Sequence, residues 1–152
     1  MRLVLQRVSR AAVRVDGAVI GEIGPGLAVL VGVRTSDRPA DAEWLADKVA
    51  NLRIFSDDAG KMNRSLLEVG GAVLSVSQFT LYADTSGGRR PSFIGAAAGG
   101  EAEAVYEAFN AALRARSVPV ATGRFGAVMA VEIHNDGPVT ILLERERGVG
   151  ED

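Results

Sequence analysis

The continuous apolar run at residues 27–33 constrains the fold more than any other segment. A half-exposed strand alternates apolar and polar residues, so an uninterrupted run indicates a strand that is buried on both faces. Residues 3–15 also read as a strand, and residues 18–23 follow it after Asp16-Gly17, a dipeptide favoured in tight hairpins. We expect these three strands to form an antiparallel meander.

Two later segments have apolar residues at helical spacing. The second helix is predicted over residues 101–116. Pro39 can open the first helix, because a proline's missing N–H costs nothing in the first turn, and apolar residues then recur at Ala42, Leu45, Ala46, Val49 and Leu52. Further strands are expected at residues 71–76, 127–133 and 139–143. This order predicts an α+β fold, a largely antiparallel sheet or open barrel covered by two main helices.

Length and composition limit the class of protein. We assign residues 1–146 to a single domain and residues 147–152 to a polar C-terminal tail, and we expect the chain to fray from Glu144 onward. The absence of cysteine excludes thiol nucleophiles, disulfides and cysteine-ligated zinc, and the single histidine, His134, excludes a multi-histidine metal site within one chain. No window has the length of a membrane span and no signal peptide is recognisable, so we expect a cytoplasmic protein.

Two polar motifs interrupt apolar runs where buried strands are predicted to end: Ser77-Gln78-Phe79-Thr80 and Asn135-Asp136-Gly137-Pro138-Val139-Thr140. A strand end gives polar groups a rigid support from which to face a ligand. The hydroxyls and amide of the first motif suit a carbonyl or ester site with backbone N–H groups. Alternatively, they satisfy local backbone groups, and the tetrapeptide read alone fits this second interpretation better.

A hydroxyl nucleophile normally needs a base, and His134 is the only imidazole. One interpretation is therefore a Ser or Thr hydrolase that uses His134. The interpretation we favour is that His134 is a strand residue near a turn, since no oriented acid partner is evident. The pair Gly137-Pro138 likewise reads either as a hairpin turn or as backbone that faces a ligand with no Cβ in the way.

The loop after the first motif is glycine-rich and contains Arg89 and Arg90. It reads either as a phosphate contact or as a solvated turn. The net charge of −2 argues against broad, nonspecific nucleic-acid binding but allows such a local contact. Residues 96–100 read as a mobile connection. Asp57 and Asp58 lack the spacing of a calcium loop, so we predict a plain turn there.

Taken together, the two motifs resemble the two signatures of the D-aminoacyl-tRNA deacylase family. The resemblance runs nearly end to end and is far more specific than a single short motif. Its other matching segments are Gln6-Arg7-Val8, Gly24-Pro25-Gly26-Leu27, Arg53-Ile54-Phe55, Gly60-Lys61-Met62-Asn63, Arg90-Pro91-Ser92-Phe93 and Thr122-Gly123-Arg124-Phe125. His134 lies outside the family pattern, and the tail after Glu144 is longer than is typical.

The resemblance implies a homodimer that hydrolyses the ester between a D-amino acid and the 3′-terminal adenosine of tRNA. It implies that glycine mischarged on tRNA is also a substrate and that L-aminoacyl-tRNA is rejected. It implies no metal and no organic cofactor. The ribose 2′-hydroxyl of the substrate can position or activate water, which would remove the need for a protein base.

The resemblance also assigns roles to residues. Ser77, Gln78, Phe79 and Thr80 are expected to line the reaction centre. Gly137 and Pro138 are expected to share a cis bond and to reach into the partner subunit's site, held there by Arg7. Phe125 and Met129 match positions near the adenine pocket. A rival from another class is a non-catalytic oligomeric module that holds an adenosine or amino acid in the same cleft.

Overall fold

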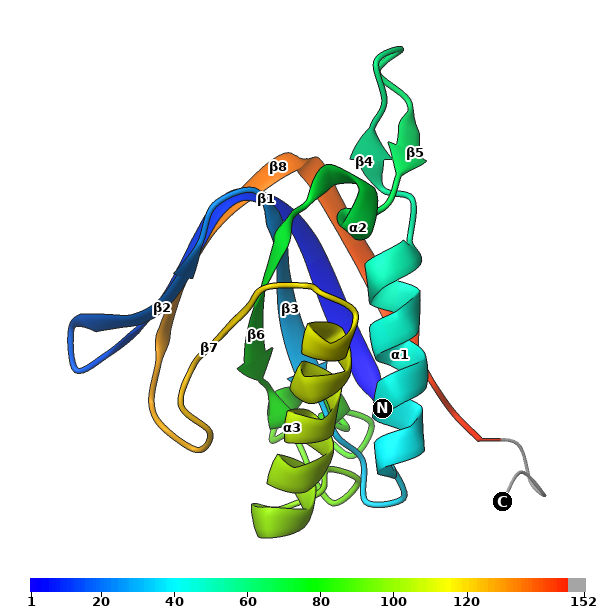
Figure 1. Ribbon diagram of the computed structural model, residues 1–152. Coiled ribbons are helices and arrows are strands. Elements are labelled where there is room, and N and C mark those ends of the chain that lie inside the picture. Colours follow the sequence, from blue (N-terminus) through cyan, green and yellow to red (C-terminus); the bar gives the residue numbers. More distant parts are fainter. Residues whose placement is uncertain (148–152) are drawn as a thin grey trace.

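A computed structural model describes residues 1–147 as a strongly curved sheet, an open barrel, with two long helices packed against one face (Figure 1). The six strands of the main sheet are β1 (Arg2–Val15), β2 (Ala18–Ile23), β3 (Gly26–Gly32), β6 (Ala72–Ser77), β7 (Val120–Thr122) and β8 (Ala130–Glu144). The remaining elements are α1 (Pro39–Asn51), the hairpin of β4 (Phe55–Ser56) and β5 (Met62–Arg64), α2 (Leu66–Val69), the 3₁₀ turn η1 (Phe79–Tyr82) and α3 (Gly99–Ala115). The predicted α+β class is confirmed.

The predicted meander is wrong, because β3 pairs with β1 and not with β2. The sheet order is β2-β1-β3-β6-β7, and β8 pairs with the other edge of β1. β1 has 14 residues, whereas β2 has six and β3 has seven. The two short strands therefore lie end to end along one edge of β1, with Val13 opposite Gly21 and Leu3 opposite Val31.

The two strands predicted at the C-terminal end are one strand, β8. Its register against β1 jumps from Asn135 opposite Val8 to Thr140 opposite Gln6, so the second polar motif forms a bulge within a continuous strand. The reason is again the length of β1, which offers pairing positions on both sides of the bulge. The Gly137–Pro138 peptide bond in this bulge is cis.

The core lies on both sides of the sheet. Between the sheet and the helices, Leu3, Leu5 and Val29 pack with Leu45 of α1 and Phe109 of α3. A second cluster of buried apolar residues fills the inside of the curve: Val8, Ala11, Val13, Ile23, Ala28, Leu74 and Val76. Both faces of β3 are therefore buried, as its apolar run predicts.

The short helix α2 escaped sequence analysis because four residues are too few for a helical period. A local signal was present, since Ser65 and Glu68 form a capping box. The Ser65 hydroxyl oxygen accepts from the Glu68 N–H at 3.1 Å, and the Ser65 N–H donates to the Glu68 carboxylate at 3.2 Å. The predicted turn at Asp57 is present, where its carboxylate accepts the N–H groups of Ala59 and Lys61 at 2.9 Å each.

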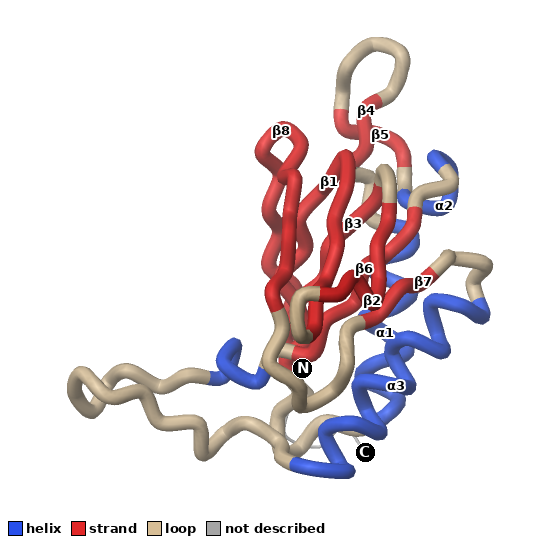
Figure 2. Tube along the Cα trace, turned by 90° about the vertical axis from the view of Figure 1, so that its left-hand side faces the viewer, coloured by secondary structure: helices blue, strands red, loops and turns tan. Residues whose placement is uncertain are grey.

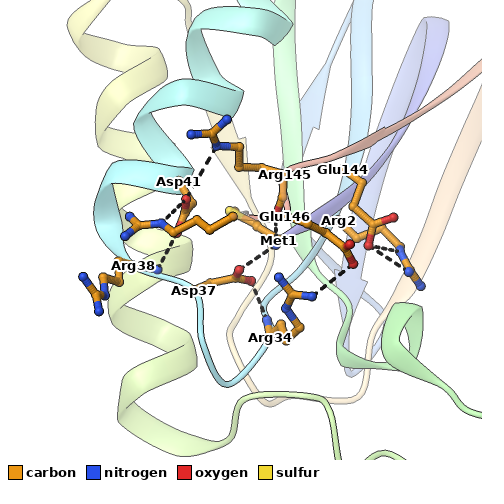
Figure 3. Close-up of polar contacts among 10 residues, drawn as sticks. Met1, Arg2, Arg34, Asp37, Arg38, Asp41, Glu144, Arg145 and Glu146 are labelled. Carbon is orange, nitrogen blue, oxygen red and sulfur yellow. Dashed lines mark hydrogen bonds and ion pairs between the residues drawn. The ribbon is translucent and has the colours of Figure 1, made fainter. Parts of the chain in front are cut away.

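Charged residues join the two ends of the described chain beside α1 (Figure 3). The nitrogen of Met1 lies 2.6 Å from the Asp37 carboxylate, and the Arg145 N–H donates to the Met1 carbonyl at 2.9 Å. Arg147 donates to the buried carboxylate of Asp41 at 2.9 Å. The expected fraying from Glu144 is thus wrong for residues 145–147, because Asp41 of α1 pairs with both Arg145 and Arg147. Residues 148–152 of the expected tail lie outside the described residues.

Within residues 1–147, no helix combines the length and the apolar character that crossing a membrane requires.

Candidate active site

A cavity of about 550 Å³ opens at the end of β6. Its walls come mainly from the end of β6 with η1, the segment that precedes α3, the first turns of α3, and the loop between β7 and β8, with single residues added after β3 and at the start of β8. The residues that line it are Val33, Val76, Ser77, Gln78, Phe79, Phe93, Ala96, Ala97, Ala98, Gly99, Ala102, Phe125, Gly126, Ala127, Met129 and Val131.

Ser77, Gln78 and Phe79 of the first polar motif form one wall, where β6 ends and η1 begins, whereas Thr80 is not among the lining residues. Ser77 is the last residue of β6 and pairs in parallel with Val31 of β3, and the Gln78 N–H donates to the Val31 carbonyl at 2.8 Å. The side-chain amide of Gln78 is hydrogen-bonded to the Thr80 hydroxyl. Phe79 is 55% exposed. The strand therefore fixes the backbone of this wall, and the polar side chains stand beyond its end.

The opposite wall is aromatic and comes from the loop between β7 and β8, which carries Phe125 and Met129. The ring of Phe125 packs against buried Tyr106 of α3, with ring centroids 6.1 Å apart. The Tyr106 hydroxyl donates to the Ser75 carbonyl of β6 at 2.8 Å. Burial raises the pKa of the Tyr106 phenol, so the hydroxyl stays protonated and keeps donating. Tyr106 thus connects the two walls.

The segment before α3 is part of the site, and the expectation of a mobile connection at residues 96–100 is wrong. The Ala97 N–H donates to the Val33 carbonyl at 2.9 Å, and Ala96 forms a β-bridge with Arg34. Phe93 meets Phe79 edge to face, with centroids 5.1 Å apart. Sequence reasoning did not connect Ala96, Ala97, Ala98 and Gly99 with the site, because alanine and glycine carry no chemical signal.

The described lining of the cavity is uncharged. Among residues 1–147, those that line the cavity include no ionisable side chain. His134 is not among them, since side chains alternate along a strand and Val131 and Ile133 occupy the buried face of β8. The exposed ring of His134 lies 3.3 Å from the Arg10 guanidinium instead. The described residues also contain no group of three or more side chains suited to hold a metal ion.

Arg7, Gly137 and Pro138 do not line this cavity. Arg7 pairs with Leu27 near the start of β3, whereas Ser77 pairs with Val31, four residues further along, which is about 13 Å of strand. The Arg7 guanidinium donates to the Asp136 carbonyl at 3.1 Å and to the Ile54 carbonyl at 2.8 Å. It therefore fastens the bulge of β8 to the segment that enters β4, at the other end of the sheet.

Comparison with known proteins agrees with this geometry. The model of the D-Tyr-tRNA(Tyr) deacylase family matches residues 4–144. A D-aminoacyl-tRNA deacylase of Thermomicrobium roseum is 62% identical over 144 residues, covering 95% of this chain and 94% of the relative. One of Deinococcus radiodurans is 60% identical and covers 95% and 99%.

Two solved structures share the fold. A c-Myc DNA unwinding element binding protein superposes with a TM-score of 0.90 at 40% identity, covering 97% of this chain and 100% of its own. A probable eukaryotic D-amino acid tRNA deacylase superposes with a TM-score of 0.82 at 19% identity, covering 93% and 97%. Fold, site and relatives together define a hydrolase of the class that acts on aminoacyl-tRNA esters. The chain belongs to the D-Tyr-tRNA(Tyr) deacylase family, which confirms the resemblance seen in the sequence.

Proposed function

We propose that the chain hydrolyses the ester between a D-amino acid and the 3′-terminal adenosine of tRNA, and also removes glycine mischarged on tRNA. The observation that carries this proposal is the cavity, which has hydroxyl and amide groups on one wall and no ionisable side chain among its described lining residues. An aminoacyl ester is already activated, so stabilising the tetrahedral oxyanion suffices without a protein base. We place this reaction in the cytoplasm.

The proposed roles follow the two walls. Ser77, Gln78, Phe79 and Thr80 contact the reacting ester, with backbone N–H groups beyond β6 and the Gln78 amide facing the oxyanion. Phe125 and Met129 hold the adenine, because an apolar and aromatic wall suits the face of a base. The substrate's own 2′-hydroxyl orients the attacking water, a group that RNA has and DNA lacks. No metal or organic cofactor is part of this proposal.

Thr80 is expected to position the substrate and not to attack it. Its hydroxyl is bonded to the Gln78 amide, and no hydrogen bond within residues 1–147 joins it to a basic side chain. Thr80→Ala should lower kcat by about tenfold, the effect of one lost hydrogen bond in the transition state, and leave measurable turnover. Rapid quenching during turnover should show no aminoacyl-enzyme. Trapping an amino acid esterified to Thr80 would refute this role.

The active unit is proposed to be a homodimer in which each cavity receives Gly137 and Pro138 from the partner subunit. The motivation is their separation from the cavity of their own chain, combined with the two-fold symmetry that lets one interface complete two sites. Activity per chain should fall when dilution separates the subunits. Sedimentation at the assay concentrations tests this, and a fully active monomer would contradict it.

Matched D- and L-tyrosyl-tRNA test the proposed function directly, with ester loss as the readout. Turnover of the D-substrate alone supports the deacylase. No turnover of either substrate supports a binding module. His134→Ala provides the third arm: unchanged activity fits the position of His134 outside the cavity, whereas abolished activity would support the hydrolase that uses His134 as its base.

A further inference from the structure

We propose that Arg89, Arg90 and Arg124 form a phosphate-binding rim at the mouth of the cavity, which contacts the sugar–phosphate backbone of the tRNA acceptor end. This arginine rim rests on the proposed function, because it deepens the account of how the same site takes its substrate. The arginine rim accounts for how this chain binds tRNA. Because the chain has a net charge of −2, it must bind a polyanion through a local group of positive charges.

Most arginines of the described chain already have a carboxylate partner. Nine arginines of the described chain lie within 4.0 Å of a carboxylate, and they share seven carboxylates between them. No carboxylate of residues 1–147 lies within that distance of Arg89, Arg90 or Arg124. These three guanidiniums are exposed and remain available for an external anion.

The loop with Arg89 and Arg90 is anchored at its base beside the cavity wall. Its two ends are joined by a β-bridge in which Asp84 and Ser92 exchange backbone hydrogen bonds of 2.8 Å. Phe93 then packs on Phe79 at the cavity wall. The loop that follows η1 reaches out from the body of the domain (Figure 2). The arginine pair therefore projects from a base that is itself part of the site.

The nearest acid in this loop does not neutralise the pair. The Asp84 carboxylate accepts the Ser86 N–H at 2.9 Å and the Ser86 hydroxyl at 2.6 Å. These bonds lower the pKa of Asp84 and keep the carboxylate facing its own loop. Arg89 and Arg90 thus present a net positive charge outward.

Arg124 is exposed and lies on the loop between β7 and β8, which forms the opposite wall of the cavity. It directly precedes Phe125, and its carbonyl accepts the Ala127 N–H at 3.1 Å in a turn. A terminal adenosine seated against Phe125 directs the preceding phosphates outward past this rim. Guanidinium groups suit that contact, since they bind phosphate oxygens in pairs and stay charged at any physiological pH.

The test compares two substrates: full D-tyrosyl-tRNA, and adenosine esterified with D-tyrosine, which has no phosphate backbone. R89A/R90A and R124A are measured beside K48A, which removes one charge from α1, away from the cavity. For the double variant, we expect KM for the tRNA substrate to rise about tenfold and the slope of log KM against log salt to fall by roughly one per arginine. KM for the adenosine ester should stay unchanged, and K48A should match the wild type on both substrates.

Two outcomes would overturn the rim: equal losses on both substrates, which indicate a distorted cavity, or no loss on tRNA. Binding of uncharged tRNA provides a readout that is independent of turnover. A wild-type chain that binds tRNA through these arginines but cleaves neither ester would refute the proposed hydrolysis and leave the rim supported.

Discussion

Gly26→Ala is expected to prevent stable folding, with a loss of more than about 3 kcal/mol in the free energy of unfolding. Gly26 opens β3 and pairs with Ala72, the first residue of β6. A Cβ there would stand 1.9 Å from the Ala72 carbonyl oxygen and 2.7 Å from the Ala72 nitrogen. Both are backbone atoms and cannot rotate away. Relief would require β3 and β6 to separate, and β6 carries the polar wall of the site.

Gly24→Ala is the matched control, because it lies two residues earlier and a Cβ there would meet nothing within 4 Å. We expect this variant to change stability by less than about 0.5 kcal/mol. Thermal unfolding separates the two variants, since each kcal/mol shifts Tm by about 2–4 °C in a chain of this size. A Gly26→Ala protein with the Tm of the Gly24→Ala protein would show that the sheet accommodates the methyl group.

Sequence patterns predicted the elements of this fold better than their pairing. The stripe from Ala42 to Leu52 identified α1 because a 13-residue helix repeats its period several times. The partners of β1 could not be read in the same way. Hairpin signals such as Asp16-Gly17 report only neighbouring strands, whereas the length of β1 decides that β3 and β8 also pair with it.

The candidate site was likewise predicted only in part from the sequence. Ser77, Gln78 and Phe79 lie at a strand end, as their polar interruption of an apolar run predicts, and Phe125 and Met129 meet them across the cavity. The alanines before α3 escaped notice because their contribution is shape and not chemistry. The arginines required the structure, since only three-dimensional proximity shows which of them already have a carboxylate partner.

Arg7→Ala is expected to let the enzyme cleave L-aminoacyl-tRNA. In the proposed dimer, the partner subunit's Gly137 and Pro138 form a backbone wall that an L side chain meets, whereas a D side chain points towards solvent and glycine has none. Discrimination then comes from a clash built against the wrong ligand. The wall rejects only if it is held in place, because a loose bulge would yield to the L side chain.

Arg7 holds this backbone wall in place. Its side chain is 13% exposed, and it bonds the carbonyls of Asp136 and Ile54. A Cβ on Gly137, whose φ is +130°, would lie 3.1 Å from the Arg7 guanidinium, so glycine lets the bulge pack directly on this arginine. Among residues 1–147, Arg7 is the residue whose side chain donates to the Asp136 carbonyl.

Arg10→Ala is the matched control, since Arg10 also projects from β1 to β8 but contacts His134 and Glu132 outside the bulge. For Arg7→Ala, we expect the ratio of kcat/KM on D- to that on L-tyrosyl-tRNA to fall by about tenfold, the equivalent of one hydrogen bond to a charged group. Arg10→Ala should keep the wild-type ratio. Equal losses on both substrates in Arg7→Ala would mean that Arg7 supports the fold alone, and that the L-substrate is excluded by something other than a braced Gly137 and Pro138.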